Sequence, residues 1–143
     1  QNPPRQQGLP VVEKRIIRPV VAAPAAELSK RKTEPIQTIY YRADSLLLSL
    51  YDNGQVDGDT VSVVWAGKTI IAKEGLTTRP ITRTIYITPD LDDSVQLIMY
   101  AENLGLIPPN TGLLIVEDGN QRHEVRFSGD LQRNSAVIFR RKR

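Results

Sequence analysis

From residue 36 onward, apolar side chains recur at every second position in short runs, as in Leu46, Leu48 and Leu50. A period of two places successive side chains on opposite faces of the backbone. Each run therefore predicts a half-buried strand rather than a helix. The predicted strands are 36–42, 45–51, 60–66, 69–73, 81–88, 94–101, 112–117, 121–128 and 135–140.

Turn residues separate these runs, as in Asp52-Asn53-Gly54 and Asp118-Gly119-Asn120. Gly, Asn and Asp tolerate positive φ and reverse the chain at low cost. Many short strands without an amphipathic helix predict an all-β fold, an antiparallel β-sandwich of jelly-roll or immunoglobulin-like topology. The predicted sandwich domain covers 36–140, and a chain of 143 residues has no room for a second full domain.

The first 35 residues are of a different kind, since they hold six of the ten prolines. Prolines at this spacing prevent a long helix and favour extended backbone. Two short apolar clusters, Ile16-Ile17 and Val20-Val21, are too small to build a core of their own. We expect 1–35 to be an extended N-terminal arm that either docks on a partner through Ile16, Ile17, Val20 and Val21 or serves as a flexible tether.

The net charge of +3 is a difference between separated parts of the chain. The arm carries a formal charge of +4, residues 36–139 carry −5, and 140–143 carry +4, with 141–143 as a predicted basic tail. Basic clusters bind phosphates without sequence preference, but an acidic body repels the same phosphates, and neither end interleaves aromatic residues for base stacking. We therefore do not expect nucleic acid as a partner. The basic ends favour an acidic protein surface or anionic lipid headgroups, or are simply solvated.

Composition narrows the chemistry that the chain can perform. The absence of cysteine excludes a disulfide framework, cysteine-ligated metal and a thiol nucleophile, and no apolar run approaches the roughly 20 residues of a membrane helix. A Ser/His/Asp triad would depend on His123, the single histidine, which falls in a predicted strand. We therefore expect no enzyme, with a hydrolase based on loop carboxylates as the weakest alternative.

The richest loop, 51–60, packs three aspartates and two glycines between predicted strands. Calcium takes six to eight oxygen ligands, which clustered carboxylates, amides and freed carbonyls can supply. The candidate metal ligands are Asp52, Asp57, Asp59, Glu102 and Asn103. The competing interpretation is that these side chains shape turns and accept backbone hydrogen bonds where strands begin, and that Asn110 bonds its own backbone after the Pro108-Pro109 corner.

Several motifs recur together in a recognisable order: the runs 50–63 (LYDNGQVDGDTVSV), 100–105 (YAENLG), 107–111 (IPPNT) and 123–126 (HEVR). Across about 36–140 the chain resembles a domain found repeatedly in uncharacterised secreted proteins of Bacteroidota. The resemblance implies export to the periplasm, cell surface or medium after removal of a signal peptide, and it implies no activity.

In layout alone, the predicted sandwich is also similar to calcium-dependent xylan-binding modules, with the Asp57-Gly58-Asp59 loop and Glu102-Asn103 as the corresponding rim. Such modules present aromatic rings to sugars, whereas Trp65 is in phase with Val61 and Val63 and is predicted to be core. The first hypothesis is therefore a non-catalytic exported interaction or assembly subunit whose arm docks on a partner protein. The alternative is a calcium-dependent carbohydrate-binding module with polysaccharide as its ligand.

Overall fold

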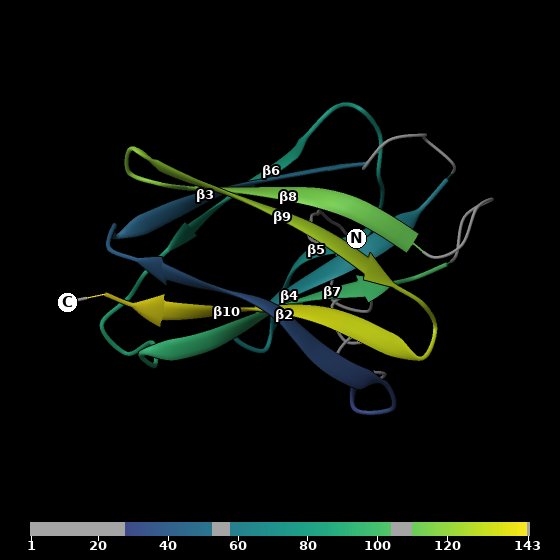
Figure 1. The fold of residues 1–143 in the computed structure, drawn as a ribbon, viewed down its shortest axis with the longest axis horizontal. Helices are drawn as coiled ribbons and strands as arrows, with labels where there is room; N and C mark the ends of the chain where they lie inside the picture. The colour runs from purple at the N-terminus through teal and green to yellow at the C-terminus, as the bar shows by residue number, and fades with distance from the viewer. Residues whose placement is uncertain (1–27, 53–57, 104–109, 143) are drawn as a thin grey trace, which may run out of the picture.

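A computed structural model describes residues 28–52, 58–103 and 110–142. These residues form two β-sheets that pack face to face, one above the other in Figure 1. No helix among them is long and apolar enough to cross a membrane. The strands are β2 (Lys32–Tyr41), β3 (Ser45–Asp52), β4 (Thr60–Trp65), β5 (Lys68–Gly75), β6 (Ile81–Tyr86), β7 (Ser94–Ala101), β8 (Asn110–Asp118), β9 (Gln121–Gly129) and β10 (Arg133–Arg141).

One sheet has the strand order β2-β10-β7-β4-β5 and the other β6-β3-β8-β9. Consecutive strands pair only in the β4–β5 and β8–β9 hairpins, so the other connections pass between the sheets. All pairs are antiparallel except β2 with β10, which run parallel. The predicted all-β sandwich is thus confirmed, with one parallel pair at the edge of the five-stranded sheet.

The alternating residues meet between the two sheets. Leu46, Leu48 and Leu50 of β3 are at most 1 % exposed. Alternating residues of β4 and β7 are buried as well: Val61, Val63, Val95, Leu97 and Met99. Trp65 lies in this core, as expected, with its ring edge-on to Phe139 at 5.0 Å between centroids. Because period two fixes which side chains face inward, the sequence pattern determined the core correctly.

The fold begins before the predicted domain boundary at residue 36. β2 starts at Lys32, and its pairing with β10 shifts register so that Ala136 lies opposite Pro35 and Val137 opposite Gln37. Proline cannot donate to a ladder and is tolerated on edge strands and at bulges, and Pro35 satisfies both conditions. The predicted strand 36–42 therefore begins too late, because β2 continues through Pro35.

Arg83 is the one charged residue in the inward row of β6, and its partners explain why a charge is tolerated there. Its guanidinium pairs with Glu74 of β5 at 2.7 Å and donates from Nε to the Ile70 carbonyl at 3.1 Å. β5 and β6 are edge strands of different sheets. Arg83 therefore joins the two sheets along an open side of the sandwich.

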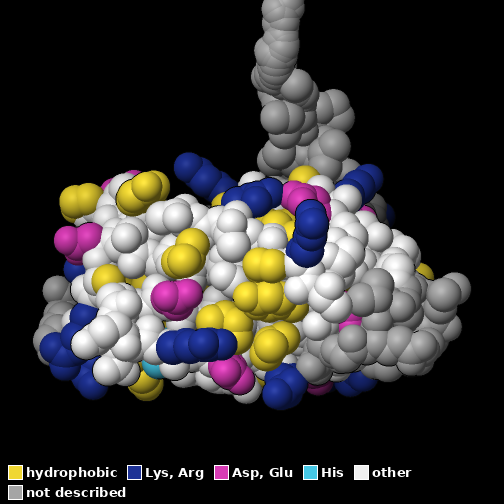
Figure 2. Space-filling view, turned by 90° about the horizontal axis from the view of Figure 1, so that it is seen from above, with side chains coloured by type: hydrophobic (Ala, Val, Ile, Leu, Met, Phe, Trp, Pro, Cys, Tyr) yellow, Lys and Arg dark blue, Asp and Glu magenta, His cyan; other side chains and the backbone are white. Residues whose placement is uncertain are grey.

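On the outer face of the four-stranded sheet, a cluster of hydrophobic side chains is surrounded by charged side chains. Figure 2 looks onto this face and shows hydrophobic side chains gathered near its middle, with charged side chains around them. Leu47 is 37 % exposed and Tyr51 and Leu113 are half-buried, while Arg122, Glu124 and Arg126 of the edge strand β9 are exposed. This outer face meets solvent along most of β9.

Leu48→Ala and Leu47→Ala are a matched test of the register. Leu48 points into the core and Leu47 away from it, so Leu48→Ala should lower the free energy of unfolding by about 2–5 kcal/mol through lost burial and a cavity. Leu47→Ala should lower it by less than about 1 kcal/mol. Urea unfolding measures both, and equal losses would contradict the assigned faces.

Candidate functional site

The predicted metal ligands that the structure describes, Asp52, Asp59, Glu102 and Asn103, lie at one end of the sandwich, where β3 ends and β8 begins. Asp52 pairs with Gly112 in the β3–β8 ladder, and Asp59 directly precedes β4. Asp57 lies outside the described residues. Within the described part of the chain, no group of three or more His, Asp or Glu side chains is placed to hold a metal ion.

Asp59 serves as a cross-link between strands. Its side chain is buried, its Oδ2 accepts a hydrogen bond from the Thr111 amide at 3.2 Å, and its carbonyl accepts one from Leu76 at 2.8 Å. The first contact joins the two sheets, because Thr111 belongs to β8. The competing interpretation from sequence, in which aspartates accept backbone hydrogen bonds at a strand start, therefore describes Asp59.

Two asparagines extend this network. The Asn103 Oδ1 accepts the Thr60 amide at 2.9 Å, and its Nδ2 donates to the Gly58 carbonyl at 3.2 Å. The buried Asn110 donates through Nδ2 to the carbonyls of Thr60 and Asn103, at 3.1 and 3.0 Å. The expectation that Asn110 bonds its own backbone is wrong, because its partners lie 50 and 7 residues away.

Glu102 turns to the other side of the five-stranded sheet. Its Oε2 accepts a hydrogen bond from the Ser62 hydroxyl at 2.6 Å, and the same hydroxyl oxygen accepts the Lys73 amide at 3.0 Å. Ser62 is buried on the outward face, since its neighbours Val61 and Val63 point into the core. The structure thus brings Asp59 and Asn103 together around Thr60 and directs the Glu102 carboxylate away from Asp59.

The arm joins the sandwich at a charged anchor. Ile16, Ile17, Val20 and Val21 lie outside the described residues, but Arg31 lies inside them. Its guanidinium sits 3.7 Å above the centre of the Tyr100 ring, and its Nη1 donates to the carbonyls of Ala101 at 2.7 Å and Asp130 at 3.3 Å. A stacked guanidinium with two carbonyl acceptors fixes the direction in which the chain enters β2.

The turn that receives Arg31 is itself held by a carboxylate. Asp130 accepts the amides of Gln132 at 2.7 Å and Arg133 at 2.8 Å. The hydrogen bond from Gln132, and secondarily that from Arg133, keeps the pKa of Asp130 below its ordinary value. The carboxylate is therefore ionised at neutral pH and keeps the β9–β10 turn in the shape that presents its carbonyl to Arg31.

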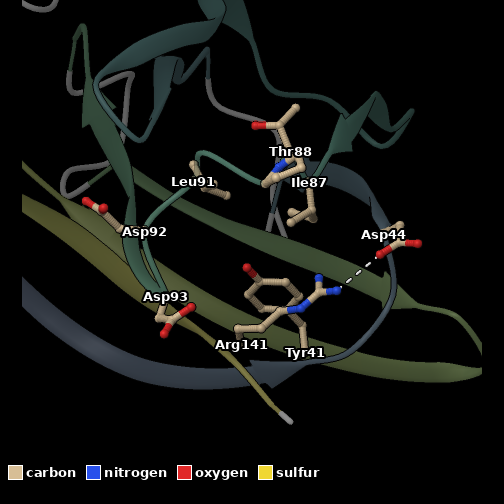
Figure 3. A pocket seen from close by; sticks show the side chains of 9 residues that line it. Tyr41, Asp44, Ile87, Thr88, Leu91, Asp92, Asp93 and Arg141 are labelled. Atoms are coloured by element: carbon tan, nitrogen blue, oxygen red, sulfur yellow. Dashed lines mark hydrogen bonds and ion pairs between the residues drawn. The ribbon is translucent and has the colours of Figure 1, made fainter.

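The opposite end of the sandwich holds an acidic hollow of about 500 Å³, drawn in Figure 3. The Arg141 side chain points toward Asp44, which it bonds at 3.1 Å, and the Arg141 amide donates to the Asp93 carbonyl at 2.9 Å, while Asp92 lies on the side opposite Asp44. The hydrogen bond with Asp44 raises the pKa of Arg141. Arg141 was assigned to a basic tail from sequence, and the structure makes it the last residue of β10.

A second hollow of about 500 Å³ lies beside it and contains an exposed aromatic ring that the sequence did not reveal. Its lining includes Tyr40, Arg42, Asn120, Gln121 and Lys142, and Tyr40 is 57 % exposed. Beneath them, Asp118 accepts the amides of Arg42 and Ala43 at 3.0 and 2.7 Å. The signal was present in the alternation, because Tyr40 falls between the inward residues Ile39 and Tyr41.

No family model matches the chain, and neither curated proteins nor solved structures give a significant match. The resemblance to the secreted Bacteroidota domain therefore stays a prediction, as does export.

Asn110→Ala tests whether the polar end is a structural network. Removing the amide takes its hydrogen bond from the Asn103 carbonyl and one of two from the Thr60 carbonyl, which also accepts the Glu102 amide at 2.8 Å. We expect a loss of about 1–3 kcal/mol in the free energy of unfolding. Asn120→Ala, in the exposed β8–β9 turn, should change it by less than about 0.5 kcal/mol. Denaturant unfolding measures both, and a neutral Asn110→Ala would show that this network does not support the fold.

Proposed function

We propose that the protein is a non-catalytic, exported interaction or assembly subunit whose N-terminal arm docks on a partner protein. The observation that carries this proposal is the Arg31 anchor, with the guanidinium stacked on Tyr100 and bonded to Ala101 and Asp130. A plain tether has no need of a fixed root. An arm whose purpose is to position the sandwich on a partner benefits from one, because a rigid junction transmits orientation.

The arm has the composition of a docking segment. Ile16, Ile17, Val20 and Val21 are apolar, and full burial of each would contribute about 1.5–3 kcal/mol. Prolines at 10, 19 and 24 restrict the unbound arm and lower the entropy lost when it is ordered. The nearby cations Lys14, Arg15 and Arg18 suit a partner whose apolar groove is bordered by carboxylates.

The structure determines which residues can be deleted to remove the arm without damaging the sandwich. A deletion of 1–35 would take away Arg31 and the first residues of β2, which pair with Arg133 and its neighbours in β10. Loss of binding would then be confounded with damage to the sandwich. The deletion that separates arm from fold is 1–27, which leaves Leu28 and the anchor in place.

A photo-crosslinking amino acid at position 17, introduced into the chain in its native host, tests the docking. We expect a discrete cross-linked protein, identified by mass spectrometry, because Ile17 would be buried in the partner. The cross-link should disappear when Ile16, Val20 and Val21 are changed to Ser and persist in the matched variant Val11→Ser with Val12→Ser.

The same cross-linker at position 47, on the outer face of the four-stranded sheet, is the control for random contact. The proposal is overturned if position 17 yields no defined product, or if positions 17 and 47 give the same products.

The second candidate, a carbohydrate-binding module, is favoured by one observation, the exposed ring of Tyr40 in a hollow with amide and cationic side chains. Tyrosine faces stack on sugar rings, and amides and cations bond hydroxyl and carboxylate groups. This hollow is at the end of the sandwich opposite Asp59 and Asn103, so sugar binding there would not pass through the candidate calcium ligands.

Affinity electrophoresis against a polysaccharide panel tests this candidate, with Tyr40→Ala as the variant. Tyr86→Ala is the control, since Tyr86 is even more exposed, at 74 %, and lies outside the hollow. Binding at the hollow should weaken at least about tenfold, or 1.4 kcal/mol, in Tyr40→Ala alone. Calcium calorimetry of the parent and of Asp57→Ala with Asp59→Ala completes the test. No retained polysaccharide rejects sugar binding, and no calcium heat in the parent rejects the calcium requirement.

A further inference from the structure

The middle of the outward face of the five-stranded sheet is apolar, whereas Tyr40 and Gln96 on the same face are exposed. Val64 of β4 and Ala136 of β10 are 1 % and 0 % exposed, and Ile98 of β7 is paired with both of them. Tyr100, on the same face, is 4 % exposed. In a two-layer sandwich the outward face meets solvent unless a third layer covers it. A covering layer over this part of the sheet would contact apolar side chains.

The described chain begins in that layer. Leu28 lines a groove of about 840 Å³ together with Val64 and Ile98, and Arg31 lies over the Tyr100 ring. From Arg31 back to Leu28 the chain thus crosses from the Tyr100 end of β7 toward its middle. The groove is also lined by the β4–β5 turn, by Asp90 and Asp92, and by 84–86 of β6 in the other sheet, so it reaches around the edge of the sandwich.

We propose that residues 18–27 of the same chain fill this groove and form the third layer on the five-stranded sheet. The segment next to Leu28 reads VVAAPAAE from Val20 to Glu27. Its small apolar side chains suit a shallow face built by Val64, Ile98 and Ala136. Pro24 fixes an extended backbone and donates no hydrogen bond, which is compatible with packing on a sheet face rather than pairing at its edge.

Charge adds to this fit. Arg18 and Arg15 follow upstream of Val20, and the groove is lined by Asp90 and Asp92 as well as by Lys68, so its carboxylates outnumber its cation. Ten residues of extended chain span at most about 33–36 Å, whereas the distance along β7 from Tyr100 to Ser94 is about 20 Å at the rise of a strand. The arm is therefore long enough to bring Arg18 to these carboxylates.

Chain continuity favours docking within one molecule. The anchor at Arg31 keeps the segment beside the groove at an effective concentration in the millimolar range, well above that of a second copy in dilute solution. A partner protein would then meet Ile16 and Ile17 first and would take Val20 and Val21 by displacing them from the groove. The inference goes beyond the proposed function, because it concerns the isolated protein with no partner present.

A spin label on Ala23→Cys tests the contact, and the absence of native cysteine makes the label unique. We expect loss of methyl signal intensity for Val64 and Ile98, with Leu47 and Leu113 on the outer face of the other sheet unaffected. Because the label could itself disturb the packing of the arm in the groove, the second measurement uses the unlabelled protein. Nuclear Overhauser contacts should join the methyl groups of Val20 or Val21 to those of Val64 or Ile98.

Charge reversal supplies the matched variants. Arg15→Glu with Arg18→Glu should restore much of the lost Val64 and Ile98 intensity, whereas Arg5→Glu, farther along the arm, should leave the effect unchanged. Absence of both the intensity loss and the Overhauser contacts overturns the proposal. Intensity loss that appears only when spin-labelled and isotope-labelled chains are mixed also overturns it, by showing that the arm binds a second copy. Neither outcome affects the cross-linking test of partner docking.

Discussion

The parallel pairing of β2 with β10 is the contact on which the arrangement of the protein depends. It lays the first described strand beside the last one, with Lys32 opposite Arg133 and Tyr41 opposite Arg141. β2 covers an edge of β10 that would otherwise be open to pairing with other chains, and it adds Ile39 and Tyr41 to the core. The arm is continuous with this strand and is therefore connected directly to the core of the sandwich. The contacts of Arg31 fix the direction in which the chain enters the strand.

The two basic segments acquire different roles from this arrangement. Arg31 is stacked on Tyr100, and Arg141 is bonded to Asp44 at the other end of the sandwich. Both cations belong to clusters that the sequence places outside the domain, yet both hold strands together. Lys14, Arg15 and Arg18, which lie outside the described residues, neighbour the apolar residues of the arm in the sequence. In both proposals made above they are the residues that would meet carboxylates.

The fold could be predicted because alternation assigns each side chain to a face without knowledge of its neighbours, as for Leu46, Leu48 and Leu50. The start of β2 could not, because a strand through Pro35 is permitted only at an edge with a bulge, which depends on where β10 lies. For the candidate site, the sequence predicted where the residues lie but not where their side chains point. Asp59, Glu102 and Asn103 do lie near Thr60, but their directions depend on non-local partners such as Thr111 and Ser62. Alternation places Tyr40 outward, but the hollow around it also depends on Asn120 and Gln121 of a distant turn.

Amide hydrogen exchange of the full chain tests most directly whether β2 is a rigid root for the arm. If β2 is part of the core, the amides of Ile39 and Tyr41 should exchange as slowly as those of Val137 and Phe139 in β10, with protection falling off toward the arm only upstream of Arg31. Arg31→Ala should release the first residues of β2 while leaving the rest protected. Fast exchange throughout β2 beside a protected β10 would contradict the anchored arm and, with it, the proposal that the arm positions the sandwich on a partner.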